Sequence, residues 1–479
     1  MAPMKGLISL LLGLLCGTDL GAQVTFARTF GGPLEDGGYG IAINSNGHYV
    51  GVGYTGSFSV GASDAFLVCV NALGSWQWQR TYGGVDADAL RDIAWFGPEG
   101  YAVGYTKSQP DGKYRGWLLA LDTFGDTLFT RCYEAPGWMW LSGIVAEPSG
   151  LYLCGTLYDS LGVPRGVVLH TDFQGQIIWE YRHPNAGLLE SSFEDITVVA
   201  DTLLATVGQG LENEPQGLLC ILRKGQPHAI RSEIIGLPQV EESLTGVSFD
   251  GTKVWFCGGG VNAAIKKKTP VVGYLSPFGS GYYLANYFFS NQYDNVYTKI
   301  YCFGNDDYYV TGKSHFLDAN FRAAILLKYV DDNLQWGVNI GYHLSEGFNA
   351  AYEMLPTSDG GIITVGEFSG PGPGLRALLF WKVDDAGQAA PHQATVSLET
   401  PAQEPCTVMP ASDGLILKCG TLGSGSQGEV MDIIGRRAYS FNLINETEMI
   451  WIPENRIPKV GIIIVRGKEG YYTTKYILP

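Results

Sequence analysis

The chain has 479 residues, of which 46% are hydrophobic, so it can build a large core and global disorder is excluded. The formal net charge of −16 argues against a nucleic-acid-binding protein. Charged residues make up only 16%, whereas 65 glycines and 12% aromatic residues favour many short strands joined by tight turns over a helical protein.

Residues 1–22 have the composition of a secretory signal peptide. "MAPMK" supplies a positive start, "GLISLLLGLLCG" supplies an apolar core, and small residues precede Gln23. No later segment has the run of about 18 apolar residues that a transmembrane helix needs. We therefore expect the mature protein to leave the cytoplasm without a membrane-spanning helix.

A repeat follows the signal peptide. Apolar runs that end in glycine, such as "YVGVG", "GYAVG" and "LYLCG", recur seven times, and a second apolar run such as "AFLVCV" follows each of them. Successive repeats are 50 to 54 residues apart, and their glycines are Gly53, Gly104, Gly155, Gly208, Gly258, Gly312 and Gly366. A period near 50 residues with about four strand signals is typical of β-propellers, and the continuous apolar runs indicate strands that are covered on both faces. We predict a seven-bladed β-propeller over residues 23–388, in preference to an open solenoid.

The repeat phase assigns a special role to the first strand. "WQRTYGG" (78–84) is the outermost strand of the first blade and leads into the next blade, and "FARTFGG" (26–32) has the same pattern with no blade before it. The seventh repeat has no outermost strand of its own. We therefore predict that residues 24–30 close the ring as the fourth strand of blade seven.

Candidate binding residues fall in the longer loops, which all lie on one face of the predicted propeller. Carboxylates recur at the entry to the innermost strands and are expected to ring the central channel, either as a cation site or as caps on their own loops: Glu35, Asp86, Glu190 and Asp294, with Glu241 one residue out of phase. Trp138 and Trp140 replace the acid in the third blade. They could stack on a sugar, anchor a protein partner or pack between blades.

Catalytic and cofactor motifs are lacking. The seven histidines are scattered without an HExxH pattern, no GxSxG segment occurs, and "GSGSQG" (423–428) is followed by a predicted strand and not by a helix. We therefore expect no cofactor and no metal. Six cysteines lie singly in apolar runs and read as buried small residues, whereas Cys406 and Cys419 are close enough in sequence to leave a local disulfide open.

The period stops after residue 388. Residues 389–405 have linker composition, and residues 406–479 contain seven short strand signals, which suggest a small immunoglobulin-like β-sandwich. Three segments of this tail, "VMPASDGLILK" (408–418), "VMDIIGRRA" (430–438) and "IPKVGIIIVRGKEGYYTTKYIL" (457–478), resemble in order the motifs of the C-terminal sorting domain of the type IX secretion system. The matching residues are Asp432, Gly435, Arg436, Gly461 and Lys475.

The resemblance implies export. It implies passage into the periplasm and then transport across the outer membrane of a Gram-negative bacterium by the type IX machinery, to the cell surface or the medium. The first functional hypothesis is a secreted or surface-bound propeller that binds a glycan or a protein. The alternative is an extracellular polysaccharide hydrolase or lyase, because such enzymes can place two acids without a short sequence signature.

Overall fold

The computed structural model describes residues 23–390 and 406–477, apart from short gaps at 185–186, 237–239, 263–266, 288–292, 305, 317–320, 342–348, 370–375, 412–413, 420–426, 433–436, 443–447, 454–459 and 468–469. The chain divides into two compact units, Met1–Thr395 and Val396–Pro479, and the division falls inside the predicted linker. Each unit is described by itself.

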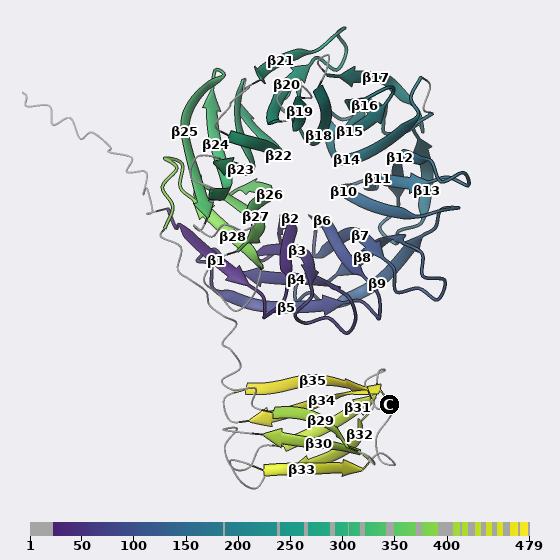
Figure 1. The fold of residues 1–479 in the computed structure, drawn as a ribbon, viewed down its shortest axis with the longest axis vertical. Helices are drawn as coiled ribbons and strands as arrows, with labels where there is room; N and C mark the ends of the chain where they lie inside the picture. The colour runs from purple at the N-terminus through teal and green to yellow at the C-terminus, as the bar shows by residue number, and fades with distance from the viewer. Residues whose placement is uncertain are drawn as a thin grey trace, which may run out of the picture. The chain divides into compact units, whose positions relative to one another are not determined.

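Seven four-stranded antiparallel sheets follow one another around a central axis, so the first unit is a seven-bladed β-propeller, as predicted (Figure 1). Blades one to three are β2 (Asp36–Ile43), β3 (Tyr49–Thr55), β4 (Asp64–Val70) and β5 (Trp76–Tyr82); β6 (Asp88–Phe96), β7 (Glu99–Thr106), β8 (Arg115–Leu121) and β9 (Thr127–Tyr133); and β10 (Met139–Glu147), β11 (Gly150–Tyr158), β12 (Pro164–Thr171) and β13 (Ile177–Arg182). Blades four to six are β14 (Glu190–Val199), β15 (Leu203–Leu211), β16 (Pro215–Arg223) and β17 (Ala229–Ile235); β18 (Val240–Phe249), β19 (Val254–Asn262), β20 (Lys267–Leu275) and β21 (Tyr283–Tyr287); and β22 (Tyr293–Gly304), β23 (Asp307–Phe316), β24 (Phe321–Val330) and β25 (Asn333–Gly341). In each, the first strand lies innermost.

Blade seven joins the two ends of the propeller. It consists of β26 (Ala350–Pro356), β27 (Ile362–Phe368), β28 (Ala377–Val383) and, outermost, β1 (Phe26–Phe30). The register runs antiparallel from Phe26 opposite Lys382 to Phe30 opposite Leu378. The predicted ring closure by the first strand is confirmed.

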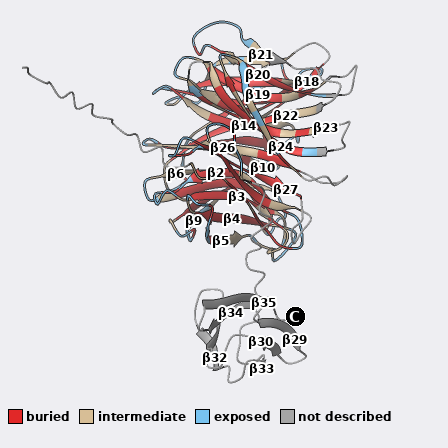
Figure 2. Cartoon of the chain, turned by 90° about the vertical axis from the view of Figure 1, so that its left-hand side faces the viewer, coloured by how far each residue is buried: buried red, intermediate tan, exposed pale blue. Residues whose placement is uncertain are grey.

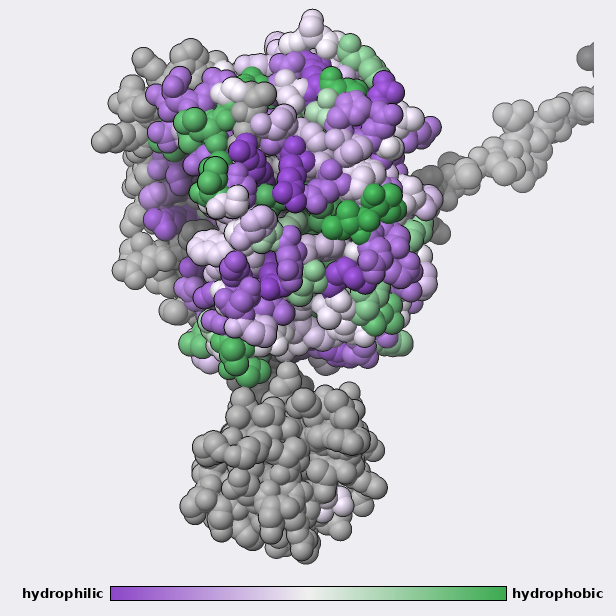
Figure 3. Space-filling model, turned by 90° about the vertical axis from the view of Figure 1, so that its right-hand side faces the viewer, coloured by the Kyte–Doolittle hydropathy of each residue, from purple (hydrophilic) through white to green (hydrophobic). Residues whose placement is uncertain are grey.

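In blades one to four the second and third strands are the most fully buried, because neighbouring blades cover both of their faces. β4 is buried along its whole length, whereas the outer strand β5 is largely solvent-accessible (Figure 2). On the side of the ring seen in Figure 3, hydrophobic residues form small separate patches among hydrophilic ones. The core therefore consists of the layers between blades, as the continuous apolar runs predicted.

A β-bulge in every innermost strand explains the repeat glycine. Each ladder between first and second strands shifts register at one extra residue, and the glycine lies opposite the residue just before that shift. A Cβ on Gly104 would lie 2.1 Å from the Ala89 carbonyl oxygen, and one on Gly53 would lie 1.9 Å from the Gly37 carbonyl oxygen. The corresponding distance is at most 2.2 Å in all seven blades. Glycine thus recurs there because no side chain fits against the bulged strand.

The second unit contains two antiparallel sheets. One is formed by β29 (Cys406–Ala411), β30 (Gly414–Cys419) and β33 (Glu448–Pro453), and the other by β31 (Gln427–Asp432), β32 (Arg437–Asn442), β34 (Val460–Gly467) and β35 (Gly470–Ile477). Asp432 lies opposite Gly461 in register, and Lys475 lies on β35. Gly435 and Arg436 lie outside the described residues, and the immunoglobulin-like arrangement stays a prediction. No helix in the described part of the chain is long and apolar enough to cross a membrane.

Candidate binding site on the propeller axis

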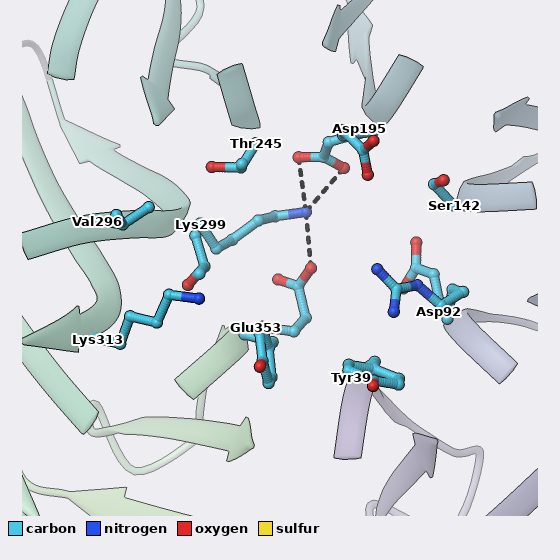
Figure 4. Close-up of a pocket in the computed structure, with 13 residues that line it drawn as sticks. Tyr39, Asp92, Ser142, Asp195, Thr245, Val296, Lys299, Lys313 and Glu353 are labelled. Atoms are coloured by element: carbon cyan, nitrogen blue, oxygen red, sulfur yellow. Dashed lines mark hydrogen bonds and ion pairs between the residues drawn. The ribbon is translucent and has the colours of Figure 1, made fainter. Parts of the chain in front are cut away.

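The seven bulges direct one side chain per blade toward a pocket on the propeller axis (Figure 4). The pocket has a volume of about 210 Å³. Its walls carry the bulged residue of every blade, which is Tyr39, Arg91, Ser142, Glu194, Thr245, Thr298 and Tyr352 in chain order. A bulge is an ordinary device for redirecting a side chain out of the ladder, and here it is repeated around the ring.

The residue after the bulge forms a second, deeper layer. It is glycine in blades one, three and five, and charged in the other four blades: Asp92, Asp195, Lys299 and Glu353. The glycines make room for their neighbours, because a Cβ on Gly40 would lie 2.6 Å from Asp92 Cα and one on Gly246 would lie 2.8 Å from Lys299 Cα. The alternation of glycine and charge places four ionisable groups around the axis.

Lys299 connects these groups across the axis. Its ammonium lies 2.9 Å from Asp195 Oδ2 and 2.8 Å from Glu353 Oε2, and the three side chains are less than one-fifth exposed. Asp195 also accepts a hydrogen bond of 2.8 Å from the backbone N–H of Val247 in the next blade. Because Lys299 lies below the bulge layer, its ion pairs form the floor of the pocket.

The remaining carboxylic acid of the deeper layer, Asp92, is held by backbone groups. It accepts hydrogen bonds from the N–H of Ile93 at 2.7 Å and, in the next blade, from the N–H of Ile144 at 2.9 Å. Burial raises the pKa of Asp92 to about 6, although Lys299 and the Ile144 N–H oppose the shift. Burial likewise raises the pKa of Glu353 to about 8, against the opposing charge of Lys299.

The upper layer of the pocket is partly aromatic. The Arg91 guanidinium lies 4.2 Å from the ring centroid of Tyr39, within the range of a cation–π contact. The Tyr39 ring meets the Tyr352 ring edge-on at 5.2 Å. Burial raises the pKa of Glu194, and the Arg91 charge opposes that shift. Arg91 therefore interacts both with the aromatic residue Tyr39 and with the acidic residue Glu194 of the pocket.

The predicted ring of acids lies at the start of the innermost strands, but it does not line this pocket. Three of its members contact groups from other segments of the chain, and not from their own loops. Glu35 pairs with Arg376 at 3.1 Å, Asp86 lies 3.7 Å from the Lys107 ammonium, and Asp294 accepts a hydrogen bond of 3.1 Å from the backbone N–H of Lys268. Glu190 is exposed at the first position of β14. Among the described residues, no group of three or more His, Cys, Asp and Glu side chains could hold a metal ion.

Buried acids one or two residues further along the chain have a structural role. Asp36 accepts hydrogen bonds from the N–H of Gly32 at 2.7 Å and the hydroxyl of Ser57 at 2.7 Å, and Asp88 makes the equivalent bonds in blade two. Both acids are fully buried. They fasten the loops between blades and so fix the rim of the channel.

Trp138 and Trp140 belong to a group of five partly exposed rings across blades two and three, which we term the aromatic shelf. The centroid distances along it are 5.4 Å for Tyr105–Tyr114, 5.6 Å for Tyr114–Trp138, 6.1 Å for Trp138–Tyr158 and 5.4 Å for Trp140–Tyr158. Trp138 is 49% exposed. Its carbonyl accepts a hydrogen bond of 2.7 Å from the Tyr158 N–H, so the backbone that carries it is fixed. Neither tryptophan lines the axial pocket.

Sequence reasoning missed the pocket residues. Each bulged residue stands 13 or 14 positions before the glycine of its repeat, as Arg91 stands before Gly104 and Tyr39 before Gly53. That spacing was available in the sequence. It carried no chemical signal, since the bulged residue differs in kind from blade to blade.

No protein-family model matches the chain, and no curated protein sequence matches it. Among solved structures, PorZ, a surface component of the type-IX secretion system of Porphyromonas gingivalis, is 12% identical with a TM-score of 0.42, and the match covers 94% of this chain and 60% of PorZ. A putative 6-phosphogluconolactonase from Bacteroides uniformis is 11% identical over 63% of this chain and 85% of that one, with a TM-score of 0.41. The propeller domain of the Trilobed protease from Pyrococcus furiosus is 12% identical over 77% and 99%, with a TM-score of 0.41. Likenesses this distant carry no argument about function.

Proposed function

We propose that this protein is an exported propeller that binds a glycan or a protein partner on its loop face. Export is supported by the signal-like residues 1–22 and by the motifs of residues 406–479 that resemble a type IX sorting domain. The proposed destination is the cell surface or the medium of a Gram-negative bacterium, and the proposed export partner is the type IX machinery.

The observation that carries the binding role is the aromatic shelf. A contiguous group of exposed aromatic rings is typical of a binding surface, because a large flat ring in a fixed position adds contact area with little loss of side-chain entropy. Trp138 is half exposed, and its ring contacts the rings of both Tyr114 and Tyr158. Neighbouring charged groups, among them the Arg115–Asp111 pair at 2.9 Å, supply hydrogen-bonding capacity beside the rings.

The test is a glycan array and a pull-down from surface extracts with the mature chain, residues 23–479. We expect a bound ligand whose affinity falls about tenfold in Trp138→Ala, the loss of roughly one stacking contact. Phe124→Ala is the matched control, because this residue is 63% exposed but lies in the turn between strands three and four of blade two, on the other face. If neither assay yields a ligand, or if both variants weaken binding equally, the proposal fails.

The second candidate function is a polysaccharide hydrolase or lyase. It is favoured by one observation, which is that Asp92 and Glu353 line the same pocket and burial raises their pKa values to about 6 and 8, in the range useful to a general acid. Lys299 and backbone N–H groups already engage these carboxyls, which favours binding over catalysis. Release of reducing sugar from a panel of polysaccharides, abolished in Asp92→Asn, would reverse that preference.

A further inference from the structure

The size of the axial pocket matches a single sugar ring. Its volume of about 210 Å³ exceeds that of an engineered cavity of about 150 Å³ that holds benzene, which is also a six-membered ring. It is below the range of about 300–1,000 Å³ that is usual for larger ligands. One ring with its hydroxyl groups would fill it.

The chemistry of the walls favours a neutral ligand. The three basic residues, Arg91, Lys299 and Lys313, are opposed by four acidic ones, Asp92, Glu194, Asp195 and Glu353. Lys299 is neutralised by its ion pairs with Asp195 and Glu353. The pocket therefore holds many hydrogen-bond donors and acceptors with little net charge. Vicinal hydroxyl groups satisfy such a surface, whereas a strongly charged ligand would be left without a counter-charge.

The pocket and the aromatic shelf adjoin one another. Tyr105, the inner end of the shelf, lies on β7 directly opposite Ala89 of β6, two residues before Arg91 in the pocket wall. The ring contacts then run outward through Tyr114 to Trp138. Lys299 and its partners Asp195 and Glu353 lie one residue further along the innermost strands than the bulged residues, away from the loop face. A chain that enters from the loop face and reaches these ion pairs would end there.

We propose that the axial pocket holds the terminal unit of a neutral glycan whose next units lie over the aromatic shelf. The inference rests on the proposed binding function and narrows its ligand to the end of a sugar chain. Ser142, a half-buried bulged residue of the pocket wall two residues after Trp140 on β10, is the position at which a larger side chain would narrow the pocket. Its side chain can be enlarged without removing an ion pair.

The experiment is calorimetric titration of the mature chain with tetrasaccharides of glucose, mannose, galactose and N-acetylglucosamine, with the corresponding monosaccharides, and with chains that end in a uronic acid. For the best tetrasaccharide we expect Ser142→Phe to weaken binding at least thirtyfold and Trp138→Ala to weaken it about tenfold. Against the monosaccharide, Trp138→Ala should have no effect, whereas Ser142→Phe should abolish binding. If Ser142→Phe fails to fold by circular dichroism, Ser142→Val replaces it, with a smaller loss of the same pattern.

The outcomes separate the two proposals. A tetrasaccharide that binds wild type and Ser142→Phe equally, but not Trp138→Ala, would keep the binding function and overturn the terminal-unit inference. Preference for the uronic-acid chains would overturn the claim of a neutral ligand. Absence of any sugar binding by wild type, with a protein partner captured instead, would overturn this inference and leave the wider binding function standing.

Discussion

Lys299 Nζ lies 2.9 Å from Asp195 Oδ2 across the propeller axis, although a complete blade separates the strands that carry them. Hydrogen-bonded ladders in a propeller join strands within a blade, and packing joins neighbouring blades. This ion pair joins blades four and six directly, and the pair of Lys299 with Glu353 extends the link to blade seven. Ion pairs therefore join blades four, six and seven at the centre of the ring.

Replacing Lys299 by methionine should destabilise the propeller by about 3–5 kcal/mol, because it removes the counter-charge from the buried carboxyl groups of Asp195 and Glu353. Urea unfolding followed by tryptophan fluorescence measures the loss. The control is Lys107→Met, since Lys107 pairs with Asp86 at 3.7 Å where both side chains are more than one-third exposed, and it should cost less than about 1 kcal/mol. If the two variants lose the same free energy of unfolding, the axial ion pairs add no more stability than an exposed surface pair.

Stability should fall as the pH rises from about 5 to 8, and Glu353 should account for part of the fall. Burial raises its pKa from the ordinary value of 4.5 to about 8, so the folded state holds a proton that the unfolded state has released across this interval. That contribution to stability is complete below the unfolded pKa and is lost as pH passes through the folded pKa. The slope is at most about 1.4 kcal/mol per pH unit for one group.

Urea unfolding of wild type and Glu353→Gln at half-unit steps of pH isolates this group. The amide cannot titrate, so the slope in Glu353→Gln should be flatter between pH 5 and 8. Asp92→Asn serves as a control with a different window, because the pKa of Asp92 is raised only to about 6. A steeper slope in Glu353→Gln than in wild type would contradict the assignment.

The fold could be predicted from the sequence because its strand and glycine pattern repeats in every blade. The pocket could not be predicted, because the residues that line it differ from blade to blade. The glycine of each repeat marks a steric requirement that seven blades share, and "FARTFGG" shows the phase of the closing strand. The pocket residues vary from tyrosine to arginine to serine. Each becomes part of a binding site only through its neighbours from other blades, which the sequence does not place beside it. Glu35 shows the same limit: its position at a strand start was correct, but its partner Arg376 lies 341 residues away.

Replacing Gly104 by alanine should destabilise the protein by about 1–3 kcal/mol or more, although the change adds a single methyl group. The new Cβ would meet the Ala89 carbonyl oxygen at 2.1 Å, and both groups belong to paired backbone. Gly225→Ala is the matched control, because it has no heavy atom within 4 Å of the added carbon and no positive φ. Thermal unfolding of both variants tests the steric account of the repeat, which fails if Gly104→Ala behaves like Gly225→Ala.

Replacing Phe30 by alanine should destabilise the propeller by about 3–5 kcal/mol. Phe30 is 1% exposed at the end of the closing strand, and its ring packs edge-on against Phe380 with centroids 5.9 Å apart. Chemical unfolding measures the loss, and limited proteolysis should cut the variant first near its N-terminus as β1 separates from β28. Phe124→Ala, at a 63% exposed position, should change stability by less than about 0.5 kcal/mol. An unchanged Phe30→Ala variant would mean that the closing strand adds little to stability.

Cys406 and Cys419 should form a disulfide under oxidising conditions. They lie directly opposite one another on β29 and β30, and the register between these strands has no shift from this pair to Ala411 opposite Gly414. Only two residues separate Ala411 from Gly414, so that pair is the hydrogen-bonded end of the hairpin. Along an antiparallel ladder, hydrogen-bonded and non-hydrogen-bonded pairs alternate. Cys406–Cys419 is five pairs away from Ala411–Gly414 and is therefore a non-hydrogen-bonded pair. Its expected Cα separation of about 4.5 Å is within the range of disulfides.

Alkylation of residues 23–479 in denaturant, without reductant, followed by intact mass measurement tests this pairing. The chain has nine cysteines, and residues 23–479 lack Cys16, so protection of the pair leaves six to be labelled. The six are the cysteines of the propeller, which are free thiols. Reduction before alkylation should add two labels, and Cys406→Ser should expose Cys419 as a seventh. Eight labels without reductant would show that the strands align the two cysteines without bonding them.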